Sequence, residues 1–125
     1  ALRPGGPTLL ARLPDGRVVL GLAGNPLAAM IGITVVAAPM LEAMTGRSLS
    51  SPMTVRASQA IPGHARATSV LPYRDIDGSA IPSAWIGSAM MRGLADSSGF
   101  LLVPPSGVDA AGQADSLSLP WPPAR

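Results

Sequence analysis

Residues 18–41 read VVLGLAGNPLAAMIGITVVAAPML and contain no charged side chain. A run of this length could span a bilayer, but the Gly-Asn-Pro segment at 24–26 interrupts it near its start, and Pro39 interrupts it near its end. The asparagine of this segment is a favourable helix N-cap, and the proline is a favourable first helical residue because its missing N–H has no partner there. The stretch therefore predicts a strand over 18–22, a tight glycine loop and a helix over 26–45, with no membrane contact.

The segment before this stretch predicts a β-hairpin. Pro14-Asp15-Gly16 lies between two apolar runs, and this turn sequence indicates a hairpin over residues 8–22. The helix that follows has almost no polar face, and Gly46 supplies its stop. A helix that is apolar all round must be covered on all sides. One hairpin cannot cover it, so residues 1–46 are expected to need further layers.

The second half of the chain differs in kind. Residues 47–52 have the composition of a linker, and residues 53–119 contain short apolar runs separated by Pro-Gly and Asp-Gly turns. This pattern predicts a small barrel-like β domain, followed by an irregular tail over 120–125. Strands are expected at 53–61, 65–71, 79–86, 100–103 and 114–119, with a short helix over 88–96. The fold class expected for the whole chain is α+β.

Composition excludes several function classes. The 125 residues include no lysine, no cysteine and one histidine, which removes Schiff-base lysine chemistry, thiol catalysis and cysteine-ligated metal sites. We expect no metal site within the chain. The net charge is only +2, the arginines are scattered, and aromatic residues make up 3%. Nucleic-acid binders cluster basic residues on one face and interleave them with aromatic side chains. Binding to nucleic acid is therefore not expected.

One loop has the features of an anion site. Residues 22–26 connect a strand to a helix N-terminus, where free N–H groups and the helix dipole favour negative charge. Arg3 could place a positive charge near this loop. From the residues alone, a plain helix start explains the loop better than an anion site does.

Three segments together resemble the C-terminal part of the molybdopterin molybdotransferase family. Residues 3–7, Arg-Pro-Gly-Gly-Pro, resemble the family's Lys-Pro-Gly-Lys-Pro, and residues 21–29, GLAGNPLAA, resemble its Gly-Leu-Pro-Gly-Asn-Pro-Val-Ser-Ala. The third segment, residues 87–112, is similar to the end of the family's sequence. Order and spacing match over nearly the whole chain.

The resemblance implies that residues 1–46 close an α/β molybdopterin-binding domain and that 53–119 form the family's small C-terminal β domain. Such enzymes insert molybdate into adenylylated molybdopterin and release AMP, with a divalent cation such as magnesium. They act as cytoplasmic homodimers. The family's essential acidic residues precede the part that this chain resembles, so the chain is expected to be a fragment that is inactive alone. No catalytic residue is assigned within it.

The resemblance also implies substrate-binding roles. The residues that it places around the bound anion are Arg3, Gly24, Asn25, Pro26 and Ser88, with Ser88 as an oxyanion contact from the β domain. Three positions depart from the family pattern: Gly6 replaces the second lysine, Ala23 a proline and Ala28 a serine. Loss of a lysine removes a donor outright.

Two other functions fit the same sequence. The chain could be a non-catalytic, diverged module that docks on a partner protein through its apolar helix. It could also be a membrane-associated protein anchored by residues 18–41.

Overall fold

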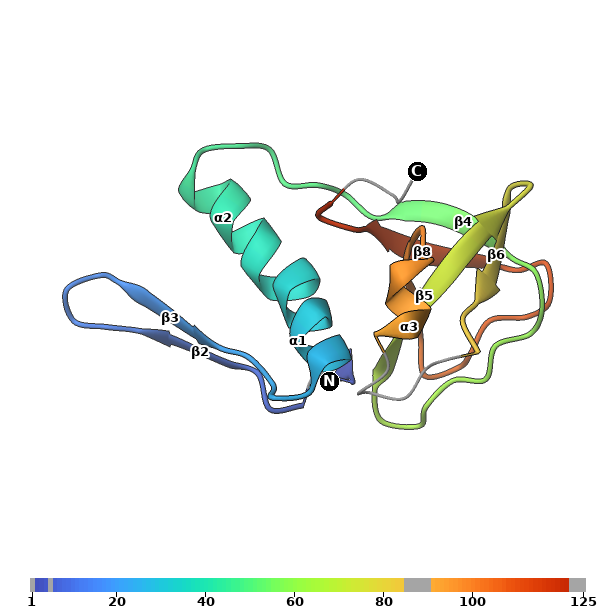
Figure 1. Ribbon diagram of the computed structural model, residues 1–125, viewed down its shortest axis with the longest axis horizontal. Helices are drawn as coiled ribbons and strands as arrows, with labels where there is room; N and C mark the ends of the chain where they lie inside the picture. Colours follow the sequence, from blue (N-terminus) through green and yellow to red (C-terminus); the bar gives the residue numbers. More distant parts are fainter. Residues whose placement is uncertain (1, 5, 85–90, 122–125) are drawn as a thin grey trace.

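A computed structural model describes residues 2–4, 6–84 and 91–121 of the chain. It consists of a projecting hairpin and a long helix beside a small closed β-barrel (Figure 1). The elements are β1 Leu2–Arg3, β2 Leu9–Arg12, β3 Val18–Gly21, α1 Pro26–Gly32, a π-helical segment Ile33–Ala37, α2 Ala38–Met44, β4 Met53–Ala57, β5 Thr68–Ile76, β6 Ser79–Pro82, α3 Arg92–Ala95, β7 Gly99–Val103 and β8 Gln113–Ser118. The predicted α+β class is confirmed.

The barrel closes through five strands in the order β5-β6-β4-β8-β7, with β7 returning to β5. Its core contains side chains from all five strands: Ala57, Tyr73, Ala80, Leu101, Val103 and Ala114, together with Ile61 from a loop. Asp77 and Gly78 both have positive φ, at 52° and 77°, which is the geometry of the tight turn between two antiparallel strands. The Asp-Gly turn predicted from the sequence is therefore confirmed.

Three predicted boundaries in the barrel were wrong. The first strand ends at Ala57 rather than at 61, since Ile61 forms only an isolated bridge with Val108. The strand expected over 79–86 ends at Pro82. Of the helix predicted over 88–96, the structure contains Arg92–Ala95, and positions 88–90 lie outside the described residues. The strand expected to stop at residue 71 continues through Pro72 to Ile76.

The strand β5 can continue through Pro72 because the backbone nitrogen of this proline, which carries no hydrogen, does not face β7. The Ser83 N–H donates to the Pro72 carbonyl at 2.8 Å, so the hydrogen-bonding side of Pro72 faces away from β7. On that side the neighbouring strand β6 ends at Pro82, opposite Tyr73. No ladder hydrogen bond from position 72 to β6 is therefore needed. A proline is tolerated in a strand where no ladder bond is lost.

The predicted helix is confirmed as one continuous helix of 19 residues, Pro26–Met44. Its middle is π-helical: the Ala38 N–H donates to the Ile33 carbonyl, five residues back. Pro39 follows immediately, and a proline ring inside an α-helix clashes with the carbonyl four residues earlier. The wider π-helical turn lets the helix continue past Pro39, and Gly46, with φ of 70°, ends it as predicted.

Only the first half of this helix is packed. Leu27 and Ile31 are buried in a cluster with Val70, Leu94 and Phe100 of the barrel unit. Replacing a fully buried leucine by alanine costs about 2–5 kcal/mol, so this cluster fixes the start of the helix on the barrel. No residue of α2 is buried, and only 28% of the helix's most apolar stretch is covered by the chain. By length and composition the helix could cross a membrane.

Two connections tie the first half of the chain to the barrel and linker. β1 runs parallel to β5, with Leu2 opposite Thr68, so the start of the chain belongs to the barrel sheet. Ser50 in the linker donates two hydrogen bonds to the Glu42 carboxylate, from its N–H at 2.9 Å and from its hydroxyl at 2.6 Å. These bonds lower the pKa of Glu42 and fasten the linker to α2.

Candidate anion-binding site

The loop at 22–26 reaches the start of the long helix as predicted. Asn25 is the N-cap, with φ of −81° and ψ of 126°, and Pro26 occupies the first turn. The Asn25 carbonyl accepts the first helical hydrogen bond, from the Ala29 N–H at 2.9 Å. The Asn25 side chain makes no cap hydrogen bond. The N–H groups of the first turn, which have no partner within a helix, are therefore not capped by this side chain.

Gly24 has a backbone conformation that does not require glycine. Its φ is not positive, and a Cβ added to it would meet no described atom within 4 Å. A glycine in such a position costs conformational entropy without relieving a steric conflict. Gly24 thus leaves open space at its own Cβ position, two residues before the first helical residue.

The backbone of Arg3 lies on the part of the barrel against which the helix starts, because its neighbour Leu2 packs in the same cluster as the helix. Leu2 packs against the cluster that contains Leu27, and Figure 1 shows the N-terminus beside the start of α1. The backbone of Arg3 is held in β1 opposite Ser69. Its side chain is exposed and makes no ion pair or hydrogen bond with any described residue. Among the described residues, the backbone of Arg3 and the helix start that the Asn25 side chain does not cap are thus both attached to the cluster of Leu27.

The other predicted positions have separate outcomes. Ser88 lies outside the described residues, so its relation to Arg3 stays a prediction. Gly6 is exposed, and an added Cβ would meet no described atom within 4 Å. Ala23 and Ala28 are 7% and 3% exposed, so both side chains lie on the packed side of the loop and helix. Among these departures from the family pattern, only Gly6 faces open space.

The described residues do not supply a metal site. No group of three histidine, aspartate or glutamate side chains is close enough to hold an ion in residues 2–4, 6–84 and 91–121. The acidic pair Asp75 and Asp77 lies at a hairpin end instead, where Asp75 Oδ1 accepts a hydrogen bond from the Gly78 N–H at 2.9 Å.

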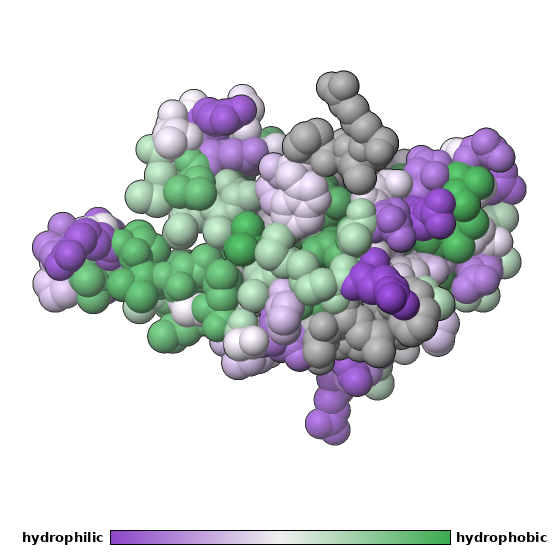
Figure 2. All heavy atoms as spheres, viewed as in Figure 1, coloured by the Kyte–Doolittle hydropathy of each residue, from purple (hydrophilic) through white to green (hydrophobic). Residues whose placement is uncertain are grey.

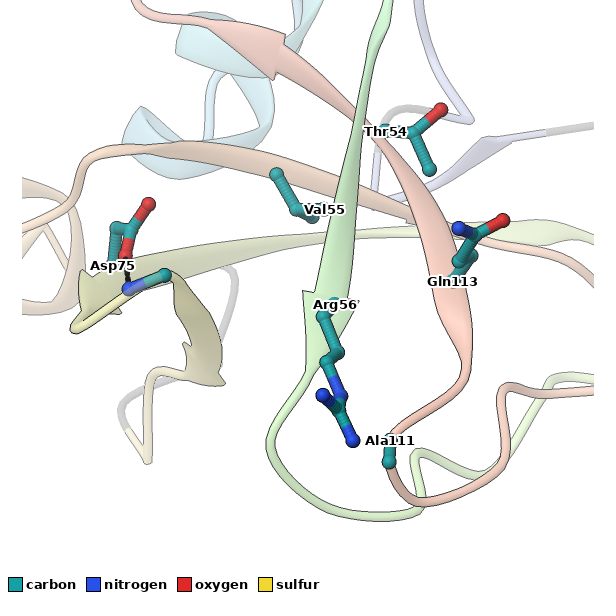
Figure 3. A pocket seen from close by; sticks show the side chains of 7 residues that line it. Thr54, Val55, Arg56, Asp75, Ala111 and Gln113 are labelled. Atoms are coloured by element: carbon teal, nitrogen blue, oxygen red, sulfur yellow. Dashed lines mark hydrogen bonds between the residues drawn. The ribbon is translucent and has the colours of Figure 1, made fainter.

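Sequence reasoning missed an open pocket of about 520 Å³ on the barrel. Thr54 and Arg56 from β4, Asp75 from β5 and Gln113 from β8 line it (Figure 3). These residues come from distant parts of the sequence and meet only through the closed strand order, so no local motif could indicate the pocket. Of the predicted anion-site residues that the structure describes, none lines this pocket.

Comparison with known proteins identifies the fold. No protein-family model matches the sequence, and no curated protein matches it. Among solved structures, the molybdopterin biosynthesis MoeA protein from Pyrococcus horikoshii has a TM-score of 0.76 and 21% identity over 97% of this chain. The chain has the MoeA fold. A molybdenum cofactor biosynthesis protein from Pyrococcus furiosus gives a TM-score of 0.75 at 21% identity over 94% of the chain.

The family resemblance predicted from the sequence is confirmed as a likeness of fold. A second structure of the Pyrococcus horikoshii MoeA protein has a TM-score of 0.76 at 19% identity and covers 94% of the chain. The chain spans 31% and 42% of the lengths of the first two MoeA-like structures. It therefore corresponds to about a third of a MoeA protein.

Proposed function

We propose that the chain acts in molybdenum cofactor biosynthesis and supplies an anion site to a molybdopterin molybdotransferase. The observation that supports this proposal is a MoeA fold in which Leu2, the neighbour of Arg3, packs in one cluster with the start of the Pro26–Met44 helix, which the Asn25 side chain does not cap. A helix N-terminus and a guanidinium both favour an oxyanion such as molybdate or the phosphate of molybdopterin. The reaction proposed is insertion of molybdate into adenylylated molybdopterin, with hydrolysis of the adenylate and release of AMP.

Each residue has a specific role in this proposal. Arg3 donates hydrogen bonds to the anion, and Gly24 lets the anion approach the backbone without a side chain between them. Asn25 and Pro26 set the direction of the helix start, so that the first-turn N–H groups point toward the anion. Ser88 is proposed as an oxyanion contact from the β domain.

The 125-residue chain is proposed to bind the anion without completing the reaction. The resemblance places the family's essential acidic residues before the part that this chain matches. The described residues contain no acidic cluster that could hold magnesium. We therefore derive no catalytic step through that ion from these residues. The cytoplasmic homodimer implied by the resemblance belongs to the same proposal.

Arg3→Ala tests the proposal directly. Molybdate binding, measured by isothermal titration calorimetry, should weaken at least about tenfold, since a charged donor that contacts an anion contributes about 1.5–3 kcal/mol. Arg12→Ala is the matched control, because it removes another exposed arginine, from the hairpin. Equal affinity in wild type and Arg3→Ala would contradict the proposed site.

A gain of affinity provides a second test. Gly6 stands where the family has a lysine, and its Cβ position is open. Gly6→Lys should restore the missing donor and tighten molybdate binding in the chain that retains Arg3. No gain would mean that this loop does not face the anion.

The alternative is a non-catalytic module that docks on a partner protein through its apolar helix. The exposure of α2, with Leu41 at 55% and Met44 at 64%, favours this alternative. The intact mass of the protein isolated from its source cell separates the two. A mass several-fold above 12.6 kDa favours the transferase, and a mass near that value favours the module.

A further inference from the structure

The pocket on the barrel lies where β4 separates from the β5–β6 hairpin. β4 pairs with β6 through Arg56 and Ala57 alone, whereas it pairs with β8 from Met53 to Arg56. Within the described residues, the first part of β4 therefore has a paired strand on one side only. The separation of the two strands leaves the open space of about 520 Å³ that the pocket occupies.

The pocket carries one positive and one negative charge that are not paired. Arg56 and Asp75 are the two charged residues in its lining, and they form no ion pair with each other. The Arg56 guanidinium makes no ion pair or hydrogen bond with any described residue. On the Asp75 carboxylate, Oδ1 accepts the hydrogen bond from Gly78, whereas Oδ2 has no partner among the described residues. Both charges are therefore available to a ligand.

The groups around the two charges are polar and are held by the strands. Asp75 is fixed at two atoms, because its backbone N–H also donates to Ser98 Oγ at 2.9 Å. Thr54 and Gln113 line the same pocket, and Figure 3 shows the Arg56 side chain between Asp75 and Gln113. Figure 2 shows hydrophilic residues at the end of the barrel that carries the β5–β6 turn. Groups that are ordered before binding lower its entropic cost, so this part of the barrel suits a polar ligand.

Both turns beside the pocket contain strained backbone. Ala111 and Asp77 have φ of 60° and 52°, and in residues 2–4, 6–84 and 91–121 no other residue except glycine has a positive φ. Ala111 lines the pocket, and Asp77 precedes Gly78, which also lines it. At position 111 a glycine would relieve the strain, whereas the alanine adds a methyl group to the pocket lining. Strained positions of this kind cluster at binding and active sites.

We propose that this pocket binds a small zwitterion, whose carboxylate contacts Arg56 and whose ammonium group contacts Asp75. A ligand with one charge would leave the opposite charge of the pocket unpaired, whereas a zwitterion forms a charged hydrogen bond with each. Arg56 and Asp75 lie on strands separated by β6, so their backbones are about 10 Å apart. This spacing favours a compound in which a short carbon chain separates the two charges over an α-amino acid, in which one carbon carries both groups. The inference does not depend on the proposed anion site, because the pocket shares no described residue with it.

Titration of the isotope-labelled protein with ε-aminocaproate, followed by NMR amide shifts, tests the proposal. Saturable shifts are expected in β4 and in the β5–β6 turn. Caproate and hexylamine each carry one of the two charges. Each should bind at least about tenfold more weakly, since a charged hydrogen bond contributes this much or more to binding. This comparison uses the wild-type protein, so it does not depend on how a variant folds.

Two variants locate the ligand. Arg56→Gln and Asp75→Asn should each weaken the binding of ε-aminocaproate by roughly tenfold or more. Asp75→Asn leaves an Oδ1 acceptor for the Gly78 N–H, so the turn should keep its hydrogen bond. The matched controls are Arg74→Gln and Asp115→Asn, which remove exposed charges of β5 and β8 that do not line this pocket.

Loss of binding in Arg56→Gln and Asp75→Asn, with both controls binding as wild type does, supports the proposal. Equal affinity for ε-aminocaproate and for caproate or hexylamine overturns it. The absence of saturable shifts overturns it as well, and so does an equal loss of affinity in the controls.

Discussion

Replacing Gly24 by alanine should stabilise the fold and weaken anion binding at the same time. Gly24 has no positive φ, and its added Cβ would meet no described atom within 4 Å. Substituting alanine for glycine at such a position stabilises a protein by about 0.4–1 kcal/mol, because the unfolded chain loses conformational freedom. For a domain of this size, that gain raises the melting temperature by about 2–5 °C.

The opposite effect is expected on binding. The proposal places the anion in front of the first-turn N–H groups beside Gly24, so the new methyl group would occupy space that the anion needs. Moving an anion out of hydrogen-bonding distance of one donor costs about 1.5–3 kcal/mol, so molybdate affinity should fall at least about tenfold. Thermal unfolding and isothermal titration calorimetry measure the two effects on the same sample.

Gly16→Ala is the control for this experiment. Gly16 has a φ of 86°, in the hairpin turn, where an alanine is strained. This variant should therefore lose about 1 kcal/mol of stability and keep its molybdate affinity. A destabilised Gly24→Ala would refute the argument that the fold does not need this glycine. A stabilised Gly24→Ala that binds molybdate as wild type does would refute the location of the anion.

Three further predictions concern the fold. Ser116→Ala should raise the free energy of unfolding by about 1 kcal/mol in chemical denaturation, because the Ser116 hydroxyl is buried in β8 with no hydrogen-bond partner among the described residues; a clear loss of stability would show that the hydroxyl has one. Gly99→Ala should lower that free energy by about 1–3 kcal/mol, since its Cβ would come within 2.6 Å of the Leu117 carbonyl oxygen; wild-type stability would contradict the packing. The pKa of Glu42 is lowered by its bonds to Ser50, so the bonds persist above the usual carboxyl pKa and are lost as the pH falls through the lowered value. Amide exchange measured by NMR should show protection of the Ser50 N–H disappearing in that range and absent in Glu42→Ala at neutral pH.

The parts of the fold that were predictable depend on local chemistry. The hairpin turn at Gly16, the helix start at Pro26 and the helix stop at Gly46 each follow from the conformation that one residue favours. These signals act over a few residues, so a single sequence carries them. The same holds for the Asp77-Gly78 turn in the barrel.

The parts that were not predictable depend on contacts between distant residues. Pro72 is acceptable in β5 only because β6 ends at Pro82, a fact of strand register rather than of local sequence. The pairing of β1 with β5 joins residues 2–3 to residues 68–69, and no local pattern indicates it. The pocket around Arg56 depends on the closed strand order in the same way.

The candidate anion site combines both kinds of information. The helix N-terminus at Asn25 and Pro26 is local, and the sequence alone indicated it. The position proposed for Arg3 is not local, because it requires β1 to pair with the barrel and Leu2 to pack in the cluster of Leu27. The barrel therefore has a specific part in the proposed function: it holds the backbone of Arg3 while the same cluster fixes the start of the helix. A substitution in that cluster, such as Leu94→Ala, should loosen both groups at once and weaken molybdate binding although Leu94 itself is only 2% exposed and lies inside the core.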